Sequence, residues 1–320
     1  MNSKLEVTRQ PTPLPFFKVM FTLMEPYTWF APTWAFVVGC VASHSIYFNP
    51  AGDLWASVVS IGKIAIGTLM AGPLLVGFSQ VWNDWCDRDV DAINQPERLI
   101  PSGRATRGQV FAIIALLGIS AMAIALFLGP PVAAVAIVGI VIALAYSAEP
   151  VRLKKNGWLG NLAIGLTYET CAWAAGHLTF DPQLQSATAG RSLLLALIYG
   201  LGVVGTMIIN DFKSVAGDRK MGIRSIPVMY GESRAARLAV VIINVAQIGA
   251  IGLQLAWGSI IAAGVCFLLL LAQIRSQVQL IREPTQPMAV RYNLIGIPPY
   301  TWAMLVAAIG LGGMLNFGVT

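Results

Sequence analysis

Charged residues are scarce in this sequence. Only 11% of its 320 residues are Asp, Glu, Lys or Arg, whereas 56% are apolar, and a typical soluble domain carries about 25% charge. The mean hydropathy is +0.69. This balance excludes a soluble globular domain. It predicts an all-α polytopic membrane protein, because apolar stretches of about 20 residues cross a bilayer as helices.

Cysteine and histidine are also rare. The four cysteines are scattered and show neither disulfide nor zinc spacing. With only two histidines, the sequence offers no Ser-His or Cys-His nucleophilic set. The pI of about 9.3 reflects loop charges and topology in such a protein, so we expect no nucleic-acid partner.

Nine apolar segments of roughly 16 to 25 residues follow one another along the chain. We predict a single intramembrane domain over residues 1–320, with residues 1–26 as a cytoplasmic N-terminal segment. The nine predicted transmembrane helices are residues 27–45, 57–81, 109–128, 131–146, 158–177, 192–210, 236–256, 258–274 and 294–316.

The basic residues agree with this count. If the N-terminus is cytoplasmic, every Lys and Arg except Lys63 and Arg191 falls in or next to a cytoplasmic segment. This is the distribution that the positive-inside rule predicts, and a miscounted span would scramble it. The C-terminus is then expected on the opposite side of the membrane.

Four carboxylates lie within eight residues, directly after the second apolar segment. On a helix at about 100° per residue, Asp84, Asp87 and Asp91 fall within roughly 60° of one another. Asn83 borders this face and Asp89 points away from it. A solvated acidic cap is the alternative, but it would oppose the helix dipole. Because carboxylate and amide oxygens suit Mg²⁺, we predict a magnesium site here.

The chain repeats this pattern once. An Asn-Asp pair at residues 83–84 ends the second apolar segment, and another at residues 210–211 ends the sixth. An Arg-x-Ile-Pro sequence follows each pair at a similar distance, at residues 98–101 and 224–227. A chance match of short sequences is the alternative to a true repeat.

The repeat predicts two related four-helix halves, residues 27–146 and 158–274, with a ninth helix at residues 294–316. Internal repeats commonly build a site at their interface, so we expect the halves to surround a central cavity. Asp211 and Asp218 are then placed to hold a second Mg²⁺ opposite the first.

Basic residues accompany both acidic clusters. Each alone could serve topology only, but together with the acids they suggest a lipid diphosphate as substrate. A metal-bound diphosphate is a leaving group, and the protein supplies positioning and charge stabilisation. The predicted diphosphate-binding residues are Arg88, Arg98, Lys154, Lys213 and Arg219.

Over almost its whole length the sequence resembles the UbiA-type superfamily of intramembrane prenyltransferases. That superfamily carries an N-D-x-x-D-x-x-x-D motif after its second helix, and a second aspartate motif after its sixth. The first motif is matched here by Asn83, Asp84, Asp87 and Asp91.

Within the superfamily, the sequence most resembles the chlorophyll and bacteriochlorophyll synthases. Residues 94–103, 146–158 and 210–219 carry this likeness. The pair at residues 168–169, Tyr-Glu, resembles the bacteriochlorophyll members more than the plant-type ones. In the second motif Ala216 stands where a glutamate is usual, so the second metal site is expected to be weaker or completed by water. Leu99 and Gln95 also depart from the usual proline and glutamate, but the neighbouring motif residues remain.

The resemblance implies a reaction. The propionate of a bacteriochlorophyllide-type macrocycle is esterified by geranylgeranyl or phytyl diphosphate, with Mg²⁺ as cofactor and release of pyrophosphate. A propionate is already ionised at pH 7, so no general base is needed. The residues that we expect to contact the pigment are Tyr146, Tyr168, Glu169, Trp173 and His177.

The resemblance also implies a location and partners. We expect an integral protein of a bacterial inner membrane, cytoplasmic or photosynthetic, with its active-site loops in the cytoplasm and in contact with membrane lipid. Whether it forms a homo-oligomer or associates with other pigment-biosynthesis or photosynthetic proteins stays open.

Glu169 is the one acid placed deep inside a predicted span. A charge there costs at least about 2.5 kcal/mol on insertion scales, so we expect a protonated carboxyl that bonds to Tyr168 or to the macrocycle. A bond between helices is the alternative. His177 could ligate the central Mg²⁺ of the pigment or simply lie at the membrane interface.

Two other functions share some of these features. A transporter would also have repeated halves, but the predicted charges lie on one side and no chain of charges crosses the bilayer. A prenyltransferase with another acceptor, such as chlorophyllide a, the bacteriochlorophyll c precursor, a quinone precursor or haem, would share the acidic motifs.

Overall fold

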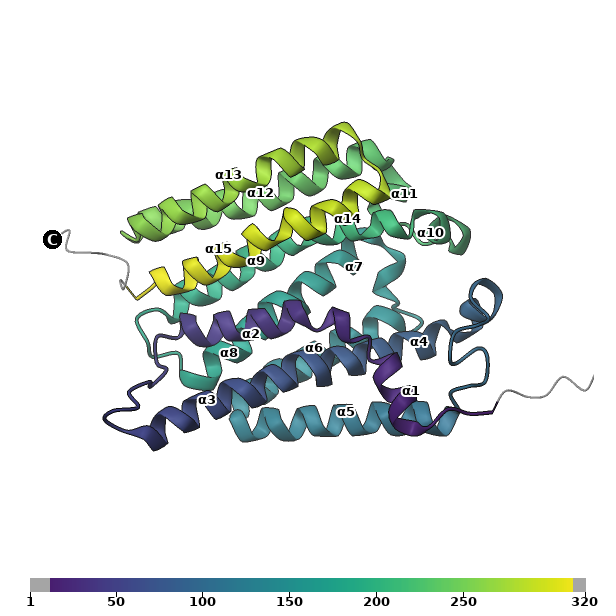
Figure 1. Cartoon of the computed structure of the whole chain (residues 1–320), viewed down its shortest axis with the longest axis horizontal. Coiled ribbons are helices and arrows are strands. Elements are labelled where there is room, and N and C mark those ends of the chain that lie inside the picture. The colour runs from purple at the N-terminus through teal and green to yellow at the C-terminus, as the bar shows by residue number, and fades with distance from the viewer. Residues whose placement is uncertain (1–11, 313–320) are drawn as a thin grey trace, which may run out of the picture.

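The computed structural model describes residues 12–312. Within this range the chain is helical apart from turns, loops and one isolated parallel β-bridge between Asn156 and Arg224. The predicted all-α class is therefore confirmed for the described residues. Most helices run along the long axis of one bundle (Figure 1).

The first group of helices comprises α3 to α6. Helix α3 (Leu54–Leu69) continues through the π-helical turn η2 (Met70–Leu74) into α4 (Leu75–Asn94), and α5 (Arg107–Leu128) and α6 (Pro130–Ser147) follow. The second group comprises α9 (Ala189–Asn210), α12 (Glu232–Ala256), α13 (Ile260–Arg282), α14 (Gln286–Ile295) and α15 (Ile297–Gly310).

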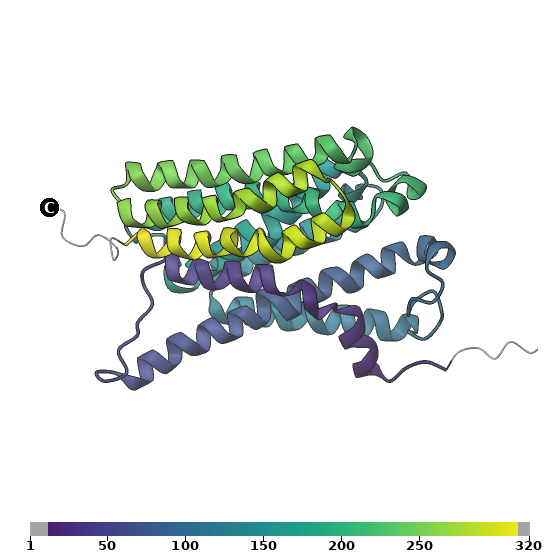
Figure 2. The same ribbon diagram turned by 45° about the horizontal axis from the view of Figure 1, so that its top comes forward.

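Helix α2 (Phe30–Ala42) packs on α8 (Ala172–Phe180), and these two helices lie between the groups (Figures 1 and 2). Helix α7 (Gly157–Ile164) leads into α8 through a second π-helical turn, η4 (Gly165–Cys171). The short helices are α1 (Phe16–Leu23), α10 (Val215–Met221), α11 (Ile226–Tyr230), η1 (Pro26–Thr28), η3 (Leu153–Lys155) and η5 (Asp211–Lys213).

Seven helical segments of the described chain are long and apolar enough to cross a membrane. The protein is therefore an integral membrane protein. The other two predicted spans fall on α2, an apolar helix of 13 residues, and on the interrupted α7–α8 segment. The count of nine spans and the division into halves are not confirmed and remain predictions. The segments that qualify are Leu54–Asn94, Arg107–Leu128, Pro130–Ser147, Ala189–Lys213, Glu232–Ala256, Ile260–Arg282 and Gln286–Gly310.

Local sequence signals explain where these helices begin. The Asp53 side chain accepts a hydrogen bond from the backbone N–H of Ala56 and caps α3. Thr106 and Gln109 form a capping box at the start of α5. Helix α5 ends at Gly129, where φ is +141°, and the proline at the start of α6 fits the first turn of a new helix.

Small residues bring the central helices into close contact. A Cβ atom on Gly39 of α2 would lie 1.9 Å from the Trp173 carbonyl oxygen of α8, and one on Gly176 would lie 2.0 Å from the Phe36 carbonyl oxygen. Such contacts are typical of helices that pack in a membrane, where close van der Waals contact drives association.

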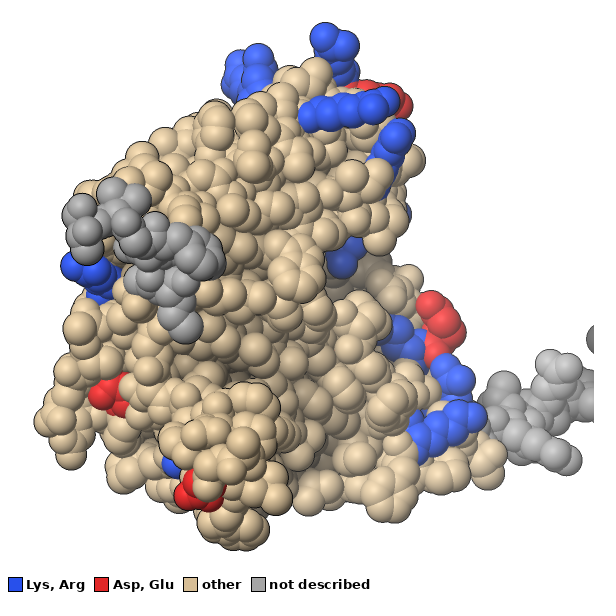
Figure 3. Space-filling model, turned by 60° about the vertical axis from the view of Figure 1, so that its left-hand side comes forward, with Lys and Arg blue, Asp and Glu red and all other residues tan. Residues whose placement is uncertain are grey.

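The surface has the charge distribution of a membrane protein. Figure 3 shows most charged side chains of this face gathered along one edge, separated by a broad uncharged area from the few at the opposite edge. The described chain begins near one end of the bundle, at α1, and α15 ends at the opposite end (Figure 1). Residues 1–11 of the predicted N-terminal segment and residues 313–316 of the predicted ninth span lie outside the described residues.

Candidate active site

A cavity of about 730 Å³ lies between the two groups of helices and is lined by residues from both. Asn83 and Asp87 of α4 line it from the first group. Asn210, Asp211 and Asp218 line it from the end of α9 and the segment that follows. The two acidic motifs, distant in sequence, therefore share one cavity.

The first motif lies on α4, because the helix continues to Asn94 and does not end with the apolar segment at residue 81. The next residue that excludes helix is Pro96. Gln80, Asn83 and Asp87 line the cavity, as expected of positions spaced three or four apart on one helical face. The motif is helical as predicted, but of the three aspartates expected on one face, Asp84, Asp87 and Asp91, Asp87 alone lines the cavity.

Asp87 is held by two cations from the segment between α6 and α7. Lys154 Nζ donates to Asp87 Oδ2 at 2.6 Å, and Arg152 donates to Oδ1 at 2.8 Å. Lys154 Nζ also lies 2.6 Å from Asn83 Oδ1, which accepts a second bond from the Ser147 hydroxyl. Burial lowers the pKa of the Lys154 ammonium, and the neighbouring Asp87 opposes that shift.

Asp84 and Asp91 face a different partner and do not line the cavity. Both bind Arg98, at 2.9 Å and 2.6 Å, and Glu25 lies 3.7 Å from the same guanidinium. The two aspartates are seven residues apart, so they share a helical stripe beside the cavity-lining one. The three aspartates that we expected to hold one ion are therefore divided between two cation clusters.

The second motif has its own polar contacts. Asn161 of α7 donates to Asp211 Oδ2 at 3.2 Å, and Ser214 donates to Asp218 Oδ2 at 2.9 Å. The Asn210 side-chain oxygen accepts from Asn293 at 2.7 Å. Ala216 is exposed and does not line the cavity.

The five predicted phosphate-binding cations are not gathered in one place. Lys154 and Lys213 line the cavity, whereas Arg98 is engaged with Asp84 and Asp91 outside it. The Arg88 guanidinium lies 4.4 Å from the Trp85 ring centre and pairs with exposed Asp89. Arg219 is exposed and does not line the cavity.

The predicted pigment contacts divide in a similar way. Tyr146, Tyr168 and Glu169 line the cavity. Trp173 is fully buried and donates to the Ser192 hydroxyl at 3.0 Å. His177 is fully buried with Nε2 3.3 Å from an Asp181 carboxylate oxygen. The last two do not line the cavity, because α8 packs closely against α2.

Sequence reasoning missed several residues of the site. Arg152, Asn161 and Glu25 contact the motif aspartates or their arginine. Asn161 carried a usable signal, because an amide inside an apolar segment needs a partner. Arg152 stands two residues before Lys154 in the same short basic loop, and this proximity was the signal for it.

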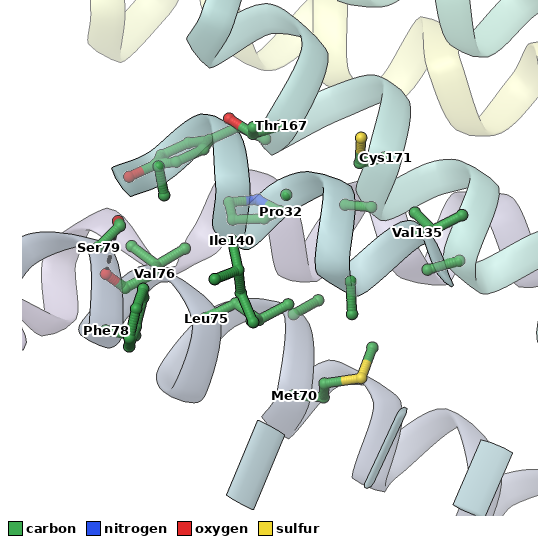
Figure 4. A pocket seen from close by; sticks show the side chains of 17 residues that line it. Pro32, Met70, Leu75, Val76, Phe78, Ser79, Val135, Ile140, Thr167 and Cys171 are labelled. Atoms are coloured by element: carbon green, nitrogen blue, oxygen red, sulfur yellow. Dashed lines mark hydrogen bonds between the residues drawn. The ribbon is translucent and has the colours of Figure 1, made fainter. Parts of the chain in front are cut away.

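A second, apolar pocket of about 60 Å³ adjoins the cavity. The two share Ser79, Ala143, Thr167 and Tyr168 as lining residues. Figure 4 shows that the side chains around this pocket are almost all hydrocarbon. The labelled ones are Pro32, Met70, Leu75, Val76, Phe78, Ser79, Val135, Ile140, Thr167 and Cys171.

The oxygen donors of the cavity fit Mg²⁺. In residues 12–312 no group of three His, Cys, Asp or Glu side chains is placed to hold a metal by itself. Mg²⁺, however, is usually bound by one or two carboxylates and completed by waters and substrate phosphates. Asn83 with Asp87, and Asp211 with Asp218, offer two such sets of hard oxygen donors.

The fold and the cavity define an integral membrane protein in which residues of both acidic motifs line one cavity together with Lys154 and Lys213. The sequence profile of the UbiA prenyltransferase family matches residues 38–297. The chain belongs to this family and is a prenyltransferase, so the transporter alternative is set aside.

Three relatives have similar sequences. The chain is 49% identical to the bacteriochlorophyll synthase 34 kDa chain of Chloroflexus aurantiacus, over 90% of this chain and 88% of the relative. It is 37% identical to the 33 kDa chain of Cereibacter sphaeroides, over 97% and 98%. It is 33% identical to the chloroplastic chlorophyll synthase of Arabidopsis thaliana, over 91% and 74%.

Two solved structures share the fold. A structure of digeranylgeranylglyceryl phosphate synthase has a TM-score of 0.66 and 21% identity, covering 92% of this chain and 99% of that one. A UbiA homologue from Archaeoglobus fulgidus, bound to GPP and Mg²⁺, has a TM-score of 0.56 and 17% identity, covering 93% and 100%.

Proposed function

We propose that the protein joins a geranylgeranyl or phytyl group to the propionate of bacteriochlorophyllide a and releases pyrophosphate. The observation that carries this proposal is that Asp87 and Asp211, one from each acidic motif, line one cavity. The similarity to bacteriochlorophyll synthases over about nine-tenths of the chain supports the choice of acceptor.

The diphosphate binds at the acidic end of the cavity. Asn83 and Asp87 would hold one Mg²⁺, and Asp211 and Asp218 would hold a second. Bound there, Mg²⁺ neutralises the diphosphate and makes it a better leaving group. Lys154 and Lys213 contribute positive charge from the same lining and bind the phosphate oxygens.

Asp84 and Asp91 serve the site through Arg98. Their ion pairs with this arginine fix the end of α4 and the loop after it. Rigid placement of Asp87 then follows, because it lies on the same helix between them. This is a positioning role, whereas the sequence alone had suggested direct ligation.

The bond changes need no general base from the protein. The allylic carbon–oxygen bond of the prenyl diphosphate breaks, and an oxygen of the ionised propionate forms the ester bond. The electron pair of the broken bond leaves with pyrophosphate. The protein therefore acts by positioning and charge stabilisation.

The two substrates have different surfaces available to them. The apolar pocket beside Tyr168 offers hydrocarbon walls for part of the prenyl chain (Figure 4). The aromatic side chains of Trp34, Tyr146, Tyr168 and Tyr300 line the large cavity and suit a flat macrocycle.

We further propose that the site lies on the cytoplasmic side of a bacterial inner membrane and that the N-terminus is cytoplasmic. The nine spans would consist of two related four-helix halves and a ninth helix. Chlorophyllide a is the second candidate acceptor, favoured by the similarity to chloroplastic chlorophyll synthase.

The test uses purified protein with Mg²⁺ and geranylgeranyl diphosphate, offered bacteriochlorophyllide a and chlorophyllide a separately. The expected products are the geranylgeranyl ester of bacteriochlorophyllide a and one pyrophosphate per ester, and chelation of Mg²⁺ should stop both. If folded protein with Mg²⁺ forms an ester with neither of the two pigments, the proposal is refuted.

A further inference from the structure

Glu169 is a buried carboxyl group without a polar partner at the wall of the cavity. It is 3% exposed, and its Oε1 has no hydrogen-bond partner in the described chain. Glu169 nevertheless lines the cavity that holds the acidic motifs. A buried polar atom of this kind is costly to leave unpaired, so its retention points to a ligand.

The surroundings favour the neutral form of this acid. Among residues 12–312, no Lys, Arg or His forms an ion pair with Glu169. A carboxylate without a counter-charge is strongly disfavoured in an apolar interior. A carboxyl group that keeps its proton has one O–H to donate.

The backbone around Glu169 is held in place on both sides. The residue lies in the π-helical turn η4, a type of irregularity that is frequent at functional sites. A Cβ atom on Gly165 would lie 2.3 Å from the Gly200 carbonyl oxygen of α9. The Thr170 hydroxyl donates to the Ala196 carbonyl oxygen of the same helix at 3.1 Å. Glu169 is therefore presented from a fixed segment.

Three other donors of the cavity wall are already used within the protein. The Tyr300 hydroxyl donates to the Tyr199 carbonyl oxygen at 2.6 Å. The Trp34 indole N–H donates to the Thr301 carbonyl oxygen at 2.9 Å. The Thr167 hydroxyl donates to the Ala163 carbonyl oxygen at 2.8 Å. Glu169 differs from these because its proton has no acceptor among the hydrogen bonds of the described residues.

From these contacts we infer that Glu169 donates a hydrogen bond to a carbonyl oxygen on the ring of the acceptor and so selects the acceptor. This inference rests on the proposed function. Bacteriochlorophyllide a carries an acetyl group at a ring position where its 3-vinyl counterpart carries a vinyl group, and the vinyl group accepts no comparable bond. Glu169 is thus a specificity-determining residue.

The test compares transfer to bacteriochlorophyllide a and to 3-vinyl bacteriochlorophyllide a, which differ only in this group. The wild-type kcat/KM should be roughly ten- to hundredfold higher for the acetyl pigment than for the vinyl pigment. The reason is that the vinyl pigment leaves the buried Glu169 donor without an acceptor. Glu169→Gln should keep most of this preference, because an amide also donates. Glu169→Leu should lose it, because transfer to the acetyl pigment slows and transfer to the vinyl pigment, freed of the unpaired donor, does not.

Gln254→Leu is the matched control. Gln254 is also fully buried with an unpartnered side-chain oxygen, but it does not line the cavity. This variant should leave the preference between the two pigments unchanged.

A second readout needs no catalysis. Resonance Raman spectra of bacteriochlorophyllide a bound without prenyl diphosphate should show a lowered acetyl carbonyl frequency in wild type and Glu169→Gln. In Glu169→Leu the frequency should return to that of the unbonded group. The same frequency in all three proteins would overturn the inference.

The outcomes separate this inference from the proposed function. Equal use of both pigments by the wild type, or equal slowing of both by Glu169→Leu, overturns the inference and leaves prenyl transfer standing. No transfer to either pigment overturns the proposed function, while the carbonyl frequency still decides whether Glu169 donates. If neither pigment binds, both the inference on Glu169 and the proposed function are overturned.

Discussion

Lys154 Nζ lies 2.6 Å from Asp87 Oδ2 and 2.6 Å from Asn83 Oδ1. The lysine comes from the segment between α6 and α7, and both oxygens come from α4. This contact places a positive charge against the proposed metal ligands and within the cavity lining. A diphosphate bound there would meet the ammonium directly.

Lys154→Met should therefore weaken use of the prenyl diphosphate. Loss of a charge-assisted hydrogen bond corresponds to about 1.5 to 3 kcal/mol, or roughly a ten- to hundredfold lower kcat/KM. Lys155→Met is the control, because Lys155 is exposed and pairs with Glu149 outside the cavity. Steady-state kinetics with varied geranylgeranyl diphosphate would measure both. Equal losses in the two variants would contradict a direct role of Lys154.

Asp87→Ala should abolish most turnover. Asp87 is the carboxylate of the first motif that faces the cavity, and loss of a metal ligand should cost at least about a hundredfold. Asp89→Ala should have a small effect, because its side chain is 81% exposed and faces Arg88. Activity assays on folded, purified variants would distinguish them. If Asp89→Ala is as inactive as Asp87→Ala, the assignment of faces on α4 is wrong.

Arg98→Ala should lower stability more than Arg88→Ala does. Arg98 bridges Asp84 and Asp91, whose side chains are largely buried, so its removal leaves carboxylates without a partner. We expect about 2 to 3 kcal/mol, less than for a fully buried pair because Arg98 is partly exposed. Arg88 forms a surface pair, worth at most about 0.5 kcal/mol.

Thermal or denaturant unfolding in detergent measures this difference. Similar unfolding curves for Arg98→Ala and Arg88→Ala would mean that the bridge between Asp84 and Asp91 contributes little.

The two ends of the chain should lie on opposite sides of the membrane. The described part begins and ends at opposite ends of the bundle (Figure 1), as an odd number of spans requires. Single cysteines placed near each end of a cysteine-free protein can be labelled from either side. Labelling of both ends from the same side would exclude nine spans.

The sequence was sufficient to predict the helical class, but it grouped Asp84 and Asp91 with Asp87, and these two face Arg98 outside the cavity. Apolar segment lengths and the helical spacing of Asn83 and Asp87 depend on local geometry alone, so they can be read from one sequence. The length of α4 was harder to predict, because a polar stretch can continue a helix until a proline ends it.

The partners of the charged groups could not be predicted. Arg98 and Arg152 both follow acidic residues at loop positions, yet one binds outside the cavity and the other contacts Asp87. Which carboxylate each reaches depends on how the loops fold over the bundle. In the same way, the close packing of α2 on α8 removes Trp173 and His177 from the cavity, and this depends on glycines in both helices.

The central claim is that both acidic motifs act on one diphosphate in the cavity between the helix groups. A structure with Mg²⁺ and the unreactive analogue geranylgeranyl S-thiolodiphosphate tests it most directly. The account predicts metal ions about 2.1 Å from oxygens of Asp87 and of Asp211, with the diphosphate between them and Lys154 on its oxygens. A diphosphate bound by one motif alone, or outside the cavity, would contradict the account.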